Sequence, residues 1–294
     1  MESWHLRFGI TSNCNFRCRY CNSHNSLSID MSDKDIKEIL EAAIKNGVKR
    51  IHWTGGEPLF KNTICEFMKY AKELGYEEQS MTTNGFYLEK NAEELKESGI
   101  SRINVSLDTM DSEKFKNIVG IDALDKVLNG IDKMLEITDC LIKINMVVMK
   151  DNIKEVKKFV NYAIEKNKLY GKERIIVRFL QFFPCNPNQL EKDGQNFWVD
   201  EYITEVNILN ELKDLGEIQE ISRKEISGDN PSMRYYKIND TITVGILAMF
   251  SWKYPCGSCH KLRITPQGNI SVCLNLGKEA TAFIPISLKQ PPKP

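Results

Sequence analysis

The chain has 294 residues, of which 41% are hydrophobic, and its 40 lysines and arginines balance its 40 aspartates and glutamates. This length can bury one large core or two unequal ones. The zero net charge gives no support for a nucleic-acid partner, although it leaves room for a local basic pocket. No apolar run reaches the length of a membrane span, and the N-terminal residues lack the apolar core of a signal peptide. We therefore expect a cytoplasmic protein without a membrane or nucleic-acid partner.

Strand and helix patterns alternate along the chain up to about residue 180. Apolar residues recur at helical spacing in residues 36–44, 124–135 and 156–164, and Ser32 with Asp35 forms a capping box before the first of these helices. Strands are predicted at His5–Ile10, Arg50–Thr54, Gln79–Thr82, Arg102–Ser106, Cys140–Val148 and Arg174–Gln181. About six strand–helix repeats predict an α/β fold with a parallel sheet and outer helices, a partial (β/α)6 barrel. Ligands bind at the carboxyl ends of the strands in such folds.

The pattern changes after residue 181, where prolines and asparagines interrupt it. A helix is predicted around Asp200–Leu215, followed by short strands at Met233–Ile238 and Thr241–Leu247. We therefore predict two domains: the partial barrel at residues 1–183 and a smaller α+β region at residues 184–294.

Nine cysteines in a reducing compartment indicate metal ligands or catalytic groups more than disulfides. Cys65 and Cys140 lie in apolar segments and are expected in the core, while Cys185 follows a strand in a loop that could approach an active site. The other six form two tight groups, Cys14/Cys18/Cys21 and Cys256/Cys259/Cys273.

The first group comes directly after the first predicted strand, with the spacing Cys14-x3-Cys18-x2-Cys21. Three thiolates on one short loop can converge on one face of a cubane cluster and leave its fourth iron without a protein ligand. A site of thiolates alone selects an iron–sulfur cluster or zinc. Structural zinc would need a fourth ligand, for which His24 is the candidate.

The segment CNFRCRYC, with the aromatic Tyr20 before its last cysteine, resembles the signature of the radical S-adenosylmethionine (SAM) superfamily. This resemblance implies a 4Fe-4S cluster whose open iron is chelated by SAM. Reduction of the cluster cleaves SAM, and the resulting 5′-deoxyadenosyl radical abstracts hydrogen from a substrate.

The ends of the next strands fit a cofactor site beside this loop. Gly55-Gly56-Glu57 closes the second strand, where glycines let the backbone approach a ligand closely, and by resemblance this segment contacts the methionyl amine. Thr83, Asn84 and Ser106 end the third and fourth strands at the same edge of the sheet and resemble further SAM contacts. The alternative for these polar residues is a set of turns that cap the strands.

The second cysteine group lies in the segment CGSCHKLRITPQGNISVCL, which resembles the GTP 3′,8-cyclase family of molybdenum cofactor biosynthesis. The resemblance extends over nearly the whole chain, from LRFGITSNCNFRCRYC to VRFLQF. It implies that Cys256, Cys259 and Cys273 hold an auxiliary 4Fe-4S cluster that anchors the guanine ring, while the radical takes a ribose hydrogen so that carbon attacks the purine. The alternative for this group is a zinc knuckle.

The same resemblance implies a set of substrate-binding cations. Arg7, Lys143, Arg178 and Arg263 match the family pattern and could bind phosphate or ribose oxygens, whereas the alternative is surface salt bridges. The sequence departs from the pattern at Arg50 and His52, where lysine and arginine are expected, at Lys261 instead of arginine and at Gln181 instead of glutamate. The sequence given also ends at Pro294, before the family's terminal Gly-Gly.

Three interpretations follow from these residues. The first is a GTP 3′,8-cyclase, or a related nucleotide-modifying enzyme, with SAM and two 4Fe-4S clusters as cofactors. The second is a paralogue that modifies a peptide or another natural-product precursor. The third is a non-catalytic zinc-binding scaffold. For the enzymes we expect an electron donor such as flavodoxin or ferredoxin, and the oligomeric state is left open.

Overall fold

The computed structural model of the chain describes residues 4–21, 29–182, 197–226, 233–247, 260–271 and 281–282. Six parallel strands, neighbours in chain order, form the centre of its sheet: β1 (His5–Gly9), β2 (Arg50–Thr54), β3 (Glu78–Thr83), β4 (Arg102–Ser106), β5 (Leu141–Val148) and β6 (Ile175–Gln181). All six lie where the sequence predicts them, and the predicted parallel α/β fold is confirmed.

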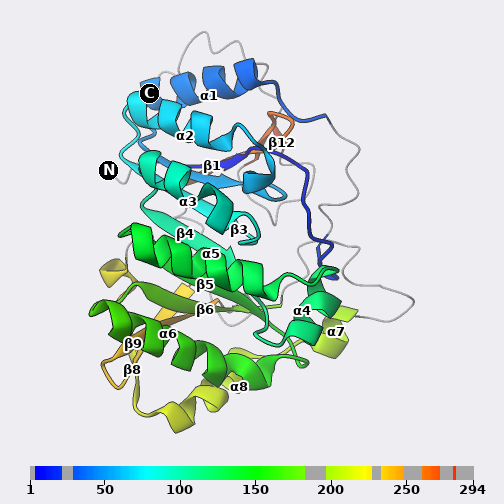
Figure 1. Cartoon of the computed structure of the whole chain (residues 1–294), viewed down its shortest axis with the longest axis vertical. Coiled ribbons are helices and arrows are strands. Elements are labelled where there is room, and N and C mark those ends of the chain that lie inside the picture. The colour runs from blue at the N-terminus through cyan, green and yellow to red at the C-terminus, as the bar shows by residue number, and fades with distance from the viewer. Residues whose placement is uncertain are drawn as a thin grey trace.

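Helices connect these strands and cover one face of the sheet. They are α1 (Asp33–Lys45), the short turn η2 (Pro58–Phe60), α2 (Ile64–Glu73), α3 (Leu88–Glu97), α4 (Ser112–Val119), α5 (Leu124–Ile137), the turn η3 (Ile153–Glu155) and α6 (Val156–Tyr170). Figure 1 shows α1, α2, α3, α5 and α6 side by side on this face. The predicted capping box is present, because the Ser32 side chain accepts from the Asp35 N–H while the Asp35 carboxylate accepts from the Ser32 N–H.

The later part of the chain extends the same sheet at both edges. The predicted helix at 200–215 is instead two helices and a turn, α7 (Phe197–Glu201), α8 (Glu205–Leu212) and η5 (Lys213–Leu215), because Thr204 forms a capping box that starts α8. The further elements are β7 (Ile218–Ile221), the turn η6 (Arg223–Glu225), β8 (Met233–Ile238), β9 (Ile242–Leu247), β10 (Lys261–Ile264), β11 (Ile270–Ser271) and β12 (Thr281–Ala282).

These strands add on either side of the six central ones, and the sheet order is β12-β11-β10-β1-β2-β3-β4-β5-β6-β9-β8-β7. β10 pairs parallel to β1 and β9 parallel to β6, so the sheet continues across the predicted boundary at residue 183. The division into two domains stays a prediction.

The central strands have two chemically different faces. Leu6 and Phe8 of β1 are fully buried in the hydrophobic core with residues of the outer helices. His5 and Arg7 alternate with them and therefore belong to the opposite face, which we call the inner face. Parallel strands covered on both sides are usually apolar on both, so a polar inner face marks the position of a site.

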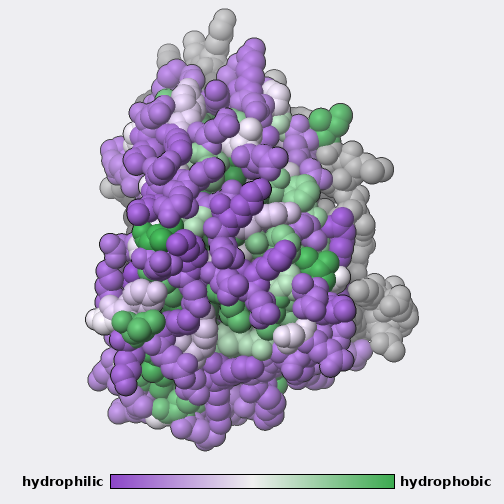
Figure 2. Space-filling model, in the orientation of Figure 1, coloured by the Kyte–Doolittle hydropathy of each residue, from purple (hydrophilic) through white to green (hydrophobic). Residues whose placement is uncertain are grey.

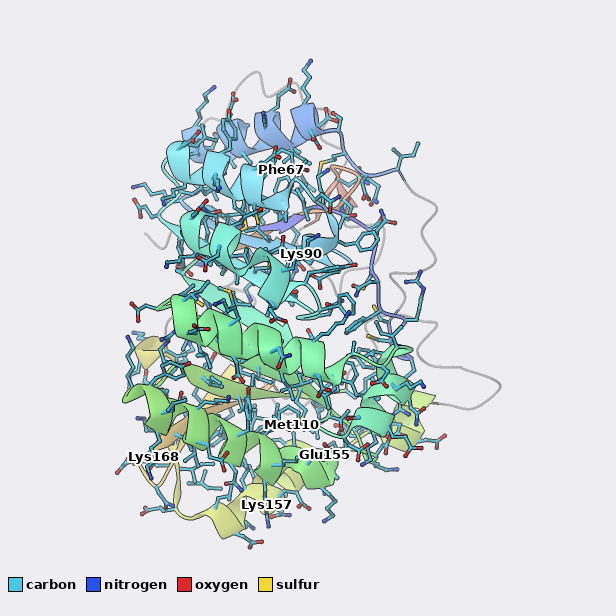
Figure 3. The ribbon with its side chains drawn as sticks, in the orientation of Figure 1. Phe67, Lys90, Met110, Glu155, Lys157 and Lys168 are labelled. Carbon is cyan, nitrogen blue, oxygen red and sulfur yellow. The ribbon has the colours of Figure 1, made fainter. Side chains whose placement is uncertain are left out.

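The opposite side of the sheet is covered by the helices (Figure 1). Figure 2 shows it as mainly hydrophilic with small separate apolar patches, and Lys90 and Lys168 extend from its helices in Figure 3. Cys65 and Cys140 are buried, as expected for core residues, whereas Cys185 lies outside the described residues. Within the described part of the chain, no helix combines the length and the apolar character needed to cross a membrane.

Candidate functional site

The loop after β1 carries the first cysteine group, with Cys14, Cys18 and Cys21 all half-buried and free of disulfides. Its backbone is held against the end of α4, because the Arg17 N–H donates to the Val119 carbonyl at 2.8 Å and the Arg19 N–H to the Ile118 carbonyl at 2.9 Å. The loop thus lies at the carboxyl ends of the strands, where the sequence predicts the site.

The glycines after β2 pack directly on this cysteine loop. The Gly56 N–H donates to the Thr11 carbonyl at 2.7 Å, and the Glu57 N–H donates to the Asn13 carbonyl at 2.8 Å. A Cβ on Gly55 would lie 2.3 Å from the Thr11 oxygen, and one on Gly56 would lie 2.2 Å from the Asn13 oxygen. What approaches these glycines in the structure is therefore the cysteine loop itself. Their contact with the methionyl amine stays a prediction.

Glu57 fastens the end of β2 to the end of β3. Its fully buried carboxylate accepts from the Leu59 N–H at 3.0 Å, the Thr83 hydroxyl at 2.7 Å and the Asn84 N–H at 2.6 Å. Burial raises the pKa of Glu57 to about 7. The carboxylate predicted to bind SAM therefore already serves three protein donors, and its SAM contact stays a prediction.

Asn84 links β3 to the cysteine loop. Its amide donates to the Asn15 side-chain oxygen at 2.8 Å and approaches the Cys14 Sγ at 3.8 Å. The Phe16 N–H also points at this sulfur, at 3.4 Å. Donors aimed at sulfur favour a thiolate, which is the form that binds metal.

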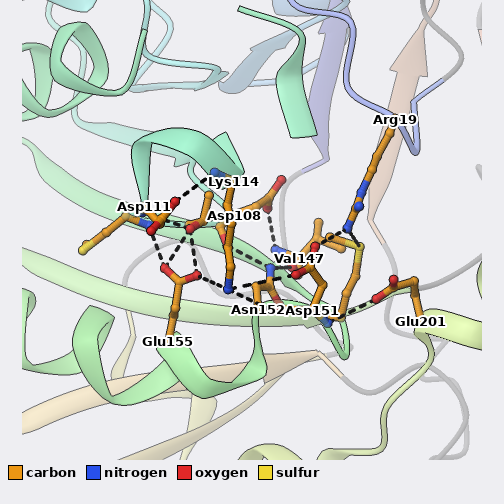
Figure 4. A network of polar contacts seen from close by, with 12 residues as sticks. Arg19, Asp108, Asp111, Lys114, Val147, Asp151, Asn152, Glu155 and Glu201 are labelled. Atoms are coloured by element: carbon orange, nitrogen blue, oxygen red, sulfur yellow. Dashed lines mark hydrogen bonds and ion pairs between the residues drawn. The ribbon is translucent and has the colours of Figure 1, made fainter. Parts of the chain in front are cut away.

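Tyr20 joins the cysteine loop to the strands on the far side of the site. Its hydroxyl donates to Asp108, a buried residue just after β4 whose pKa burial raises to about 6. Asp108 also accepts from the Val147 N–H at 2.8 Å, and Asn152 donates to the Asp108 carbonyl, as Figure 4 shows. The sequence analysis names the segment that contains Asp108 but singles out Ser106. Ser106 is half-buried at the end of β4, and its role stays a prediction.

The cysteine loop fits an iron–sulfur cluster by its donor set. Burial raises the pKa of the Cys14 and Cys18 thiols, and neighbouring acidic groups add to the effect. Such thiols lose their protons only to a strong positive partner, and an iron cluster supplies one. His24, the candidate fourth ligand for zinc, lies outside the described residues.

The inner face gathers the predicted substrate-binding cations. Strand register places Arg7 beside His52 on β2 and beside Arg263 on β10, and places His5 beside Arg50 and Lys261. Lys143 and Arg178 lie on the same face of β5 and β6, both buried. The pKa of His5 falls to about 3, because burial and then the Arg7, Arg102, Arg50 and Lys261 charges oppose its protonation.

His52 differs from the cations around it. Its ring nitrogens Nδ1 and Nε2 lie 2.8 Å from the Ser80 and Thr82 hydroxyls, respectively. Burial, followed by the charge of Arg7, holds its pKa well below the usual range, so the ring is neutral. At this position, where the family pattern expects arginine, the inner face therefore has a neutral group, and the predicted substrate contact of His52 stays untested.

Three inner-face residues were missed by the sequence analysis. Arg102 is buried and pairs with Glu78 at 2.6 Å. Asn104 is buried and donates to the Thr82 hydroxyl at 3.1 Å, and among the described residues no group donates to its side-chain oxygen. Tyr235 of β8 is fully buried. Strand alternation from Arg7 and Lys143 could have placed the first two, whereas nothing local signals Tyr235.

The second cysteine group, Cys256, Cys259 and Cys273, lies outside the described residues. The structure does describe β10, which starts two positions after Cys259 and carries Lys261 and Arg263 against β1. Gln181, the other departure, donates to the Tyr202 hydroxyl at 2.9 Å and to the Ile203 carbonyl at 2.8 Å.

Comparisons with known proteins agree with this geometry. The profile of the radical SAM superfamily matches residues 9–163. A GTP 3′,8-cyclase of Limosilactobacillus fermentum is 32% identical over 282 residues, covering 94% of this chain and 80% of that protein. A probable GTP 3′,8-cyclase of Sulfurisphaera tokodaii is 32% identical over 273 residues, covering 92% and 80%, respectively.

Solved structures share the fold at lower identity. The crystal structure of Streptococcus suis SuiB bound to SAM has a TM-score of 0.63 and 19% identity, and the match covers 94% of this chain but 60% of that one. Native anSMEcpe with bound AdoMet has a TM-score of 0.59 and 17% identity, covering 94% and 75%, respectively. At these identities the likeness supports the partial-barrel fold.

Proposed function

The chain belongs to the radical SAM superfamily and, within it, to the GTP 3′,8-cyclase family, and from this membership we propose that it is a GTP 3′,8-cyclase. It is an enzyme, and SAM and a 4Fe-4S cluster are its cofactors. The zinc-scaffold interpretation is therefore set aside.

The charge of the inner face supports a nucleoside triphosphate as the substrate. From β10 to β6, the described strand residues on this face include one carboxylate, Glu78, which pairs with Arg102. The cationic side chains on the same face are Arg7, Arg50, Arg102, Lys143, Arg178, Lys261 and Arg263. Arg102, Lys143 and Arg178 are buried and the other four are half-buried. Such a concentration of positive charge on one face attracts an anionic ligand. A triphosphate is such an anion, and a peptide backbone is not.

We assign the parts of the site as follows. When bound, the cluster on Cys14, Cys18 and Cys21 together with SAM supplies a 5′-deoxyadenosyl radical that takes hydrogen from the substrate. Gly55, Gly56 and Glu57, with Tyr20, line the SAM site beside this loop, and Thr83, Asn84 and Ser106 complete it at the ends of β3 and β4. These assignments rest on the packing of the β2 glycines, Glu57 and Asn84 around the loop.

The inner-face cations would bind the nucleotide. They lie within the strands, before the carboxyl ends that carry the proposed SAM site. Arg7 and Arg263 lie in register on neighbouring strands, and their planar guanidinium groups suit phosphate oxygens. Lys143 and Lys261 offer point charges, and Arg50, Arg178 and His52 complete the proposed contacts.

We propose further that Cys256, Cys259 and Cys273 hold an auxiliary 4Fe-4S cluster that binds the purine. The position of β10 supports this, because it brings the residues just after Cys259 beside β1. An electron donor such as flavodoxin or ferredoxin, and a cytoplasmic location, fit an oxygen-sensitive cluster enzyme with nine cysteines.

Anaerobic reconstitution with iron and sulfide provides the test. The reduced enzyme should form 5′-deoxyadenosine from SAM, GTP should increase that formation, and mass spectrometry should detect a cyclised nucleotide. ATP serves as the matched control, because it carries the same triphosphate on a different purine. With about eight irons bound per chain, failure of GTP both to stimulate cleavage and to yield product would refute the assignment.

A further inference from the structure

Tyr235 is a fully buried tyrosine on the inner face, beyond the six predicted strands. Strand register places it beside Gly245 of β9, and Gly245 beside Arg178 of β6. Because paired residues on neighbouring strands share a face, the Tyr235 side chain lies on the same face as the proposed substrate cations.

Gly245 leaves the space that brings Tyr235 and Arg178 together. A Cβ at Gly245 would lie 3.0 Å from Tyr235 Cε1 and 3.2 Å from Arg178 Cγ. The edge of the phenol ring and the stem of the arginine therefore meet above this glycine. A larger residue here would push them apart.

The same ring also faces Lys143. The Lys143 Nζ lies 5.9 Å from the centre of the Tyr235 ring, within cation–π range, and Lys143 itself is fully buried. Tyr235 also packs in a small apolar cluster with Ile176 and Met233. The ring is thus fixed by hydrophobic packing and contacts two cations on neighbouring strands.

Burial and the Tyr235 phenol act in opposite directions on the pKa of the Arg178 guanidinium. Burial lowers the pKa of Arg178 to about 10, and the Tyr235 phenol acts in the opposite direction. Arg178 also donates from Nε to the Asn145 side chain at 2.8 Å, which fixes one edge of the guanidinium. The Tyr235 ring lies beside the aliphatic part of the Arg178 side chain, above Gly245.

We propose that Tyr235 is a positioning residue that holds Lys143 and Arg178 in the geometry that binds the substrate phosphates. The inference rests on the proposed function, because it deepens the account of the same site. Tyr235 acts through the two cations, because its ring lies beside the Lys143 ammonium and the Arg178 side chain.

Steady-state kinetics of the reconstituted holoenzyme test the proposal. Tyr235→Phe keeps the ring and removes the hydroxyl, whose interaction with Arg178 favours the charged guanidinium. We expect KM for GTP to rise about 5-fold, with kcat within twofold. Tyr235→Leu removes the aromatic face as well and should raise KM about 10-fold or more. The control is Tyr236→Phe, because Tyr236 is the neighbouring buried tyrosine and donates to Glu205 at 2.9 Å. Tyr236→Phe should leave KM unchanged.

A double-mutant cycle separates positioning from general stability. In an Arg178→Gln background, Tyr235→Phe should no longer raise KM, because the cation that the hydroxyl positions is gone. An equal effect in both backgrounds would overturn the proposal, as would an unchanged KM for folded Tyr235→Phe. If Tyr235→Leu does not fold, Tyr235→Phe and the cycle decide.

Inorganic tripolyphosphate distinguishes this proposal from the GTP assignment. If the wild-type enzyme ignores GTP, the proposed function fails, and tripolyphosphate binding by equilibrium dialysis takes the place of KM. Binding that weakens about 5-fold in Tyr235→Phe but not in Tyr236→Phe supports the positioning role. No binding to wild type, or equal binding to all variants, overturns it.

Discussion

Replacing Gly56 by alanine should displace the cysteine loop without unfolding the protein. The added Cβ would lie 2.2 Å from the Asn13 oxygen and 2.7 Å from the Ser12 oxygen, and both are backbone atoms that cannot rotate away. The loop must retreat by at least the 0.8 Å that separates 2.2 Å from the 3.0 Å limit of real Cβ contacts. The two hydrogen bonds from Gly56 and Glu57 to the loop would weaken, at about 0.5–1.5 kcal/mol each.

The expected consequence is a loss of SAM cleavage. A misplacement of about 1 Å costs on the order of 100-fold in rate, so 5′-deoxyadenosine formation without GTP should fall by about that factor. Iron content and the electron paramagnetic resonance signal of the reduced cluster would show whether the cluster is lost or misplaced.

Gly47→Ala provides the matched control for this prediction. It makes the same chemical change at a left-handed glycine, φ +79°, with no atom within 4 Å. Its strain of about 1 kcal/mol should lower stability and leave cleavage intact. A Gly56→Ala enzyme with full iron content and a cleavage rate within about threefold of wild type would refute the reasoning.

Burial raises the pKa of Glu57 from 4.5 to about 7, so the native state binds more protons than the unfolded chain between these values. The contribution of Glu57 to the stability of the apoprotein should therefore fall by up to about 3 kcal/mol as the pH rises through this range. His5 and His52, whose pKa values are lowered, change the total stability in the opposite direction, so the contribution of Glu57 is measured as the difference between wild type and Glu57→Gln in anaerobic melting curves from about pH 5 to 8. Tyr20→Phe leaves Asp108 without its hydroxyl donor, so we expect about 1–3 kcal/mol lower stability in urea titrations and slower SAM cleavage. Cys256→Ala should spare SAM cleavage and abolish nucleotide product in chromatographic assays.

Each of these predictions has a contradicting result. A stability difference between wild type and Glu57→Gln that does not change with pH would show that Glu57 keeps an ordinary pKa. Unchanged stability and cleavage in Tyr20→Phe would show that its bond to Asp108 holds nothing in place. Loss of SAM cleavage in Cys256→Ala would place that cysteine with the first cluster.

Local sequence patterns were sufficient to predict the central strands of the partial barrel. All six central strands were predictable because apolar alternation and capping signals such as Ser32 are short-range. The break between α7 and α8 was missed, since the capping box at Thr204 competes with a continuous apolar stripe. β10 was missed because Lys-Leu-Arg-Ile becomes a strand through pairing with β1, far away in sequence.

The site divides in the same way. The cysteine loop, Gly55, Gly56 and the cations were identifiable from their spacing and resemblance. The sequence did not reveal why glycine is needed at positions 55 and 56, because the need arises from backbone carbonyl oxygens of the cysteine loop, which is distant in sequence. The neutrality of His52 was equally hidden, since it arises from burial of the ring and from the positive charges of Arg7 and of residues on other strands around it.

The pairing of β10 with β1 also limits how early during synthesis the sheet can form around β1. His5 lies beside Lys261, so β1 finds one of its partners 256 positions later in the chain. Closing so long a loop is entropically costly and slow, and until it happens β1 presents an open edge. During synthesis the cysteine loop is therefore made well before the strand that brings Arg263 beside Arg7. A nascent chain stalled before β10 would expose that edge, and it is in this state that we expect the protein to be most prone to aggregation.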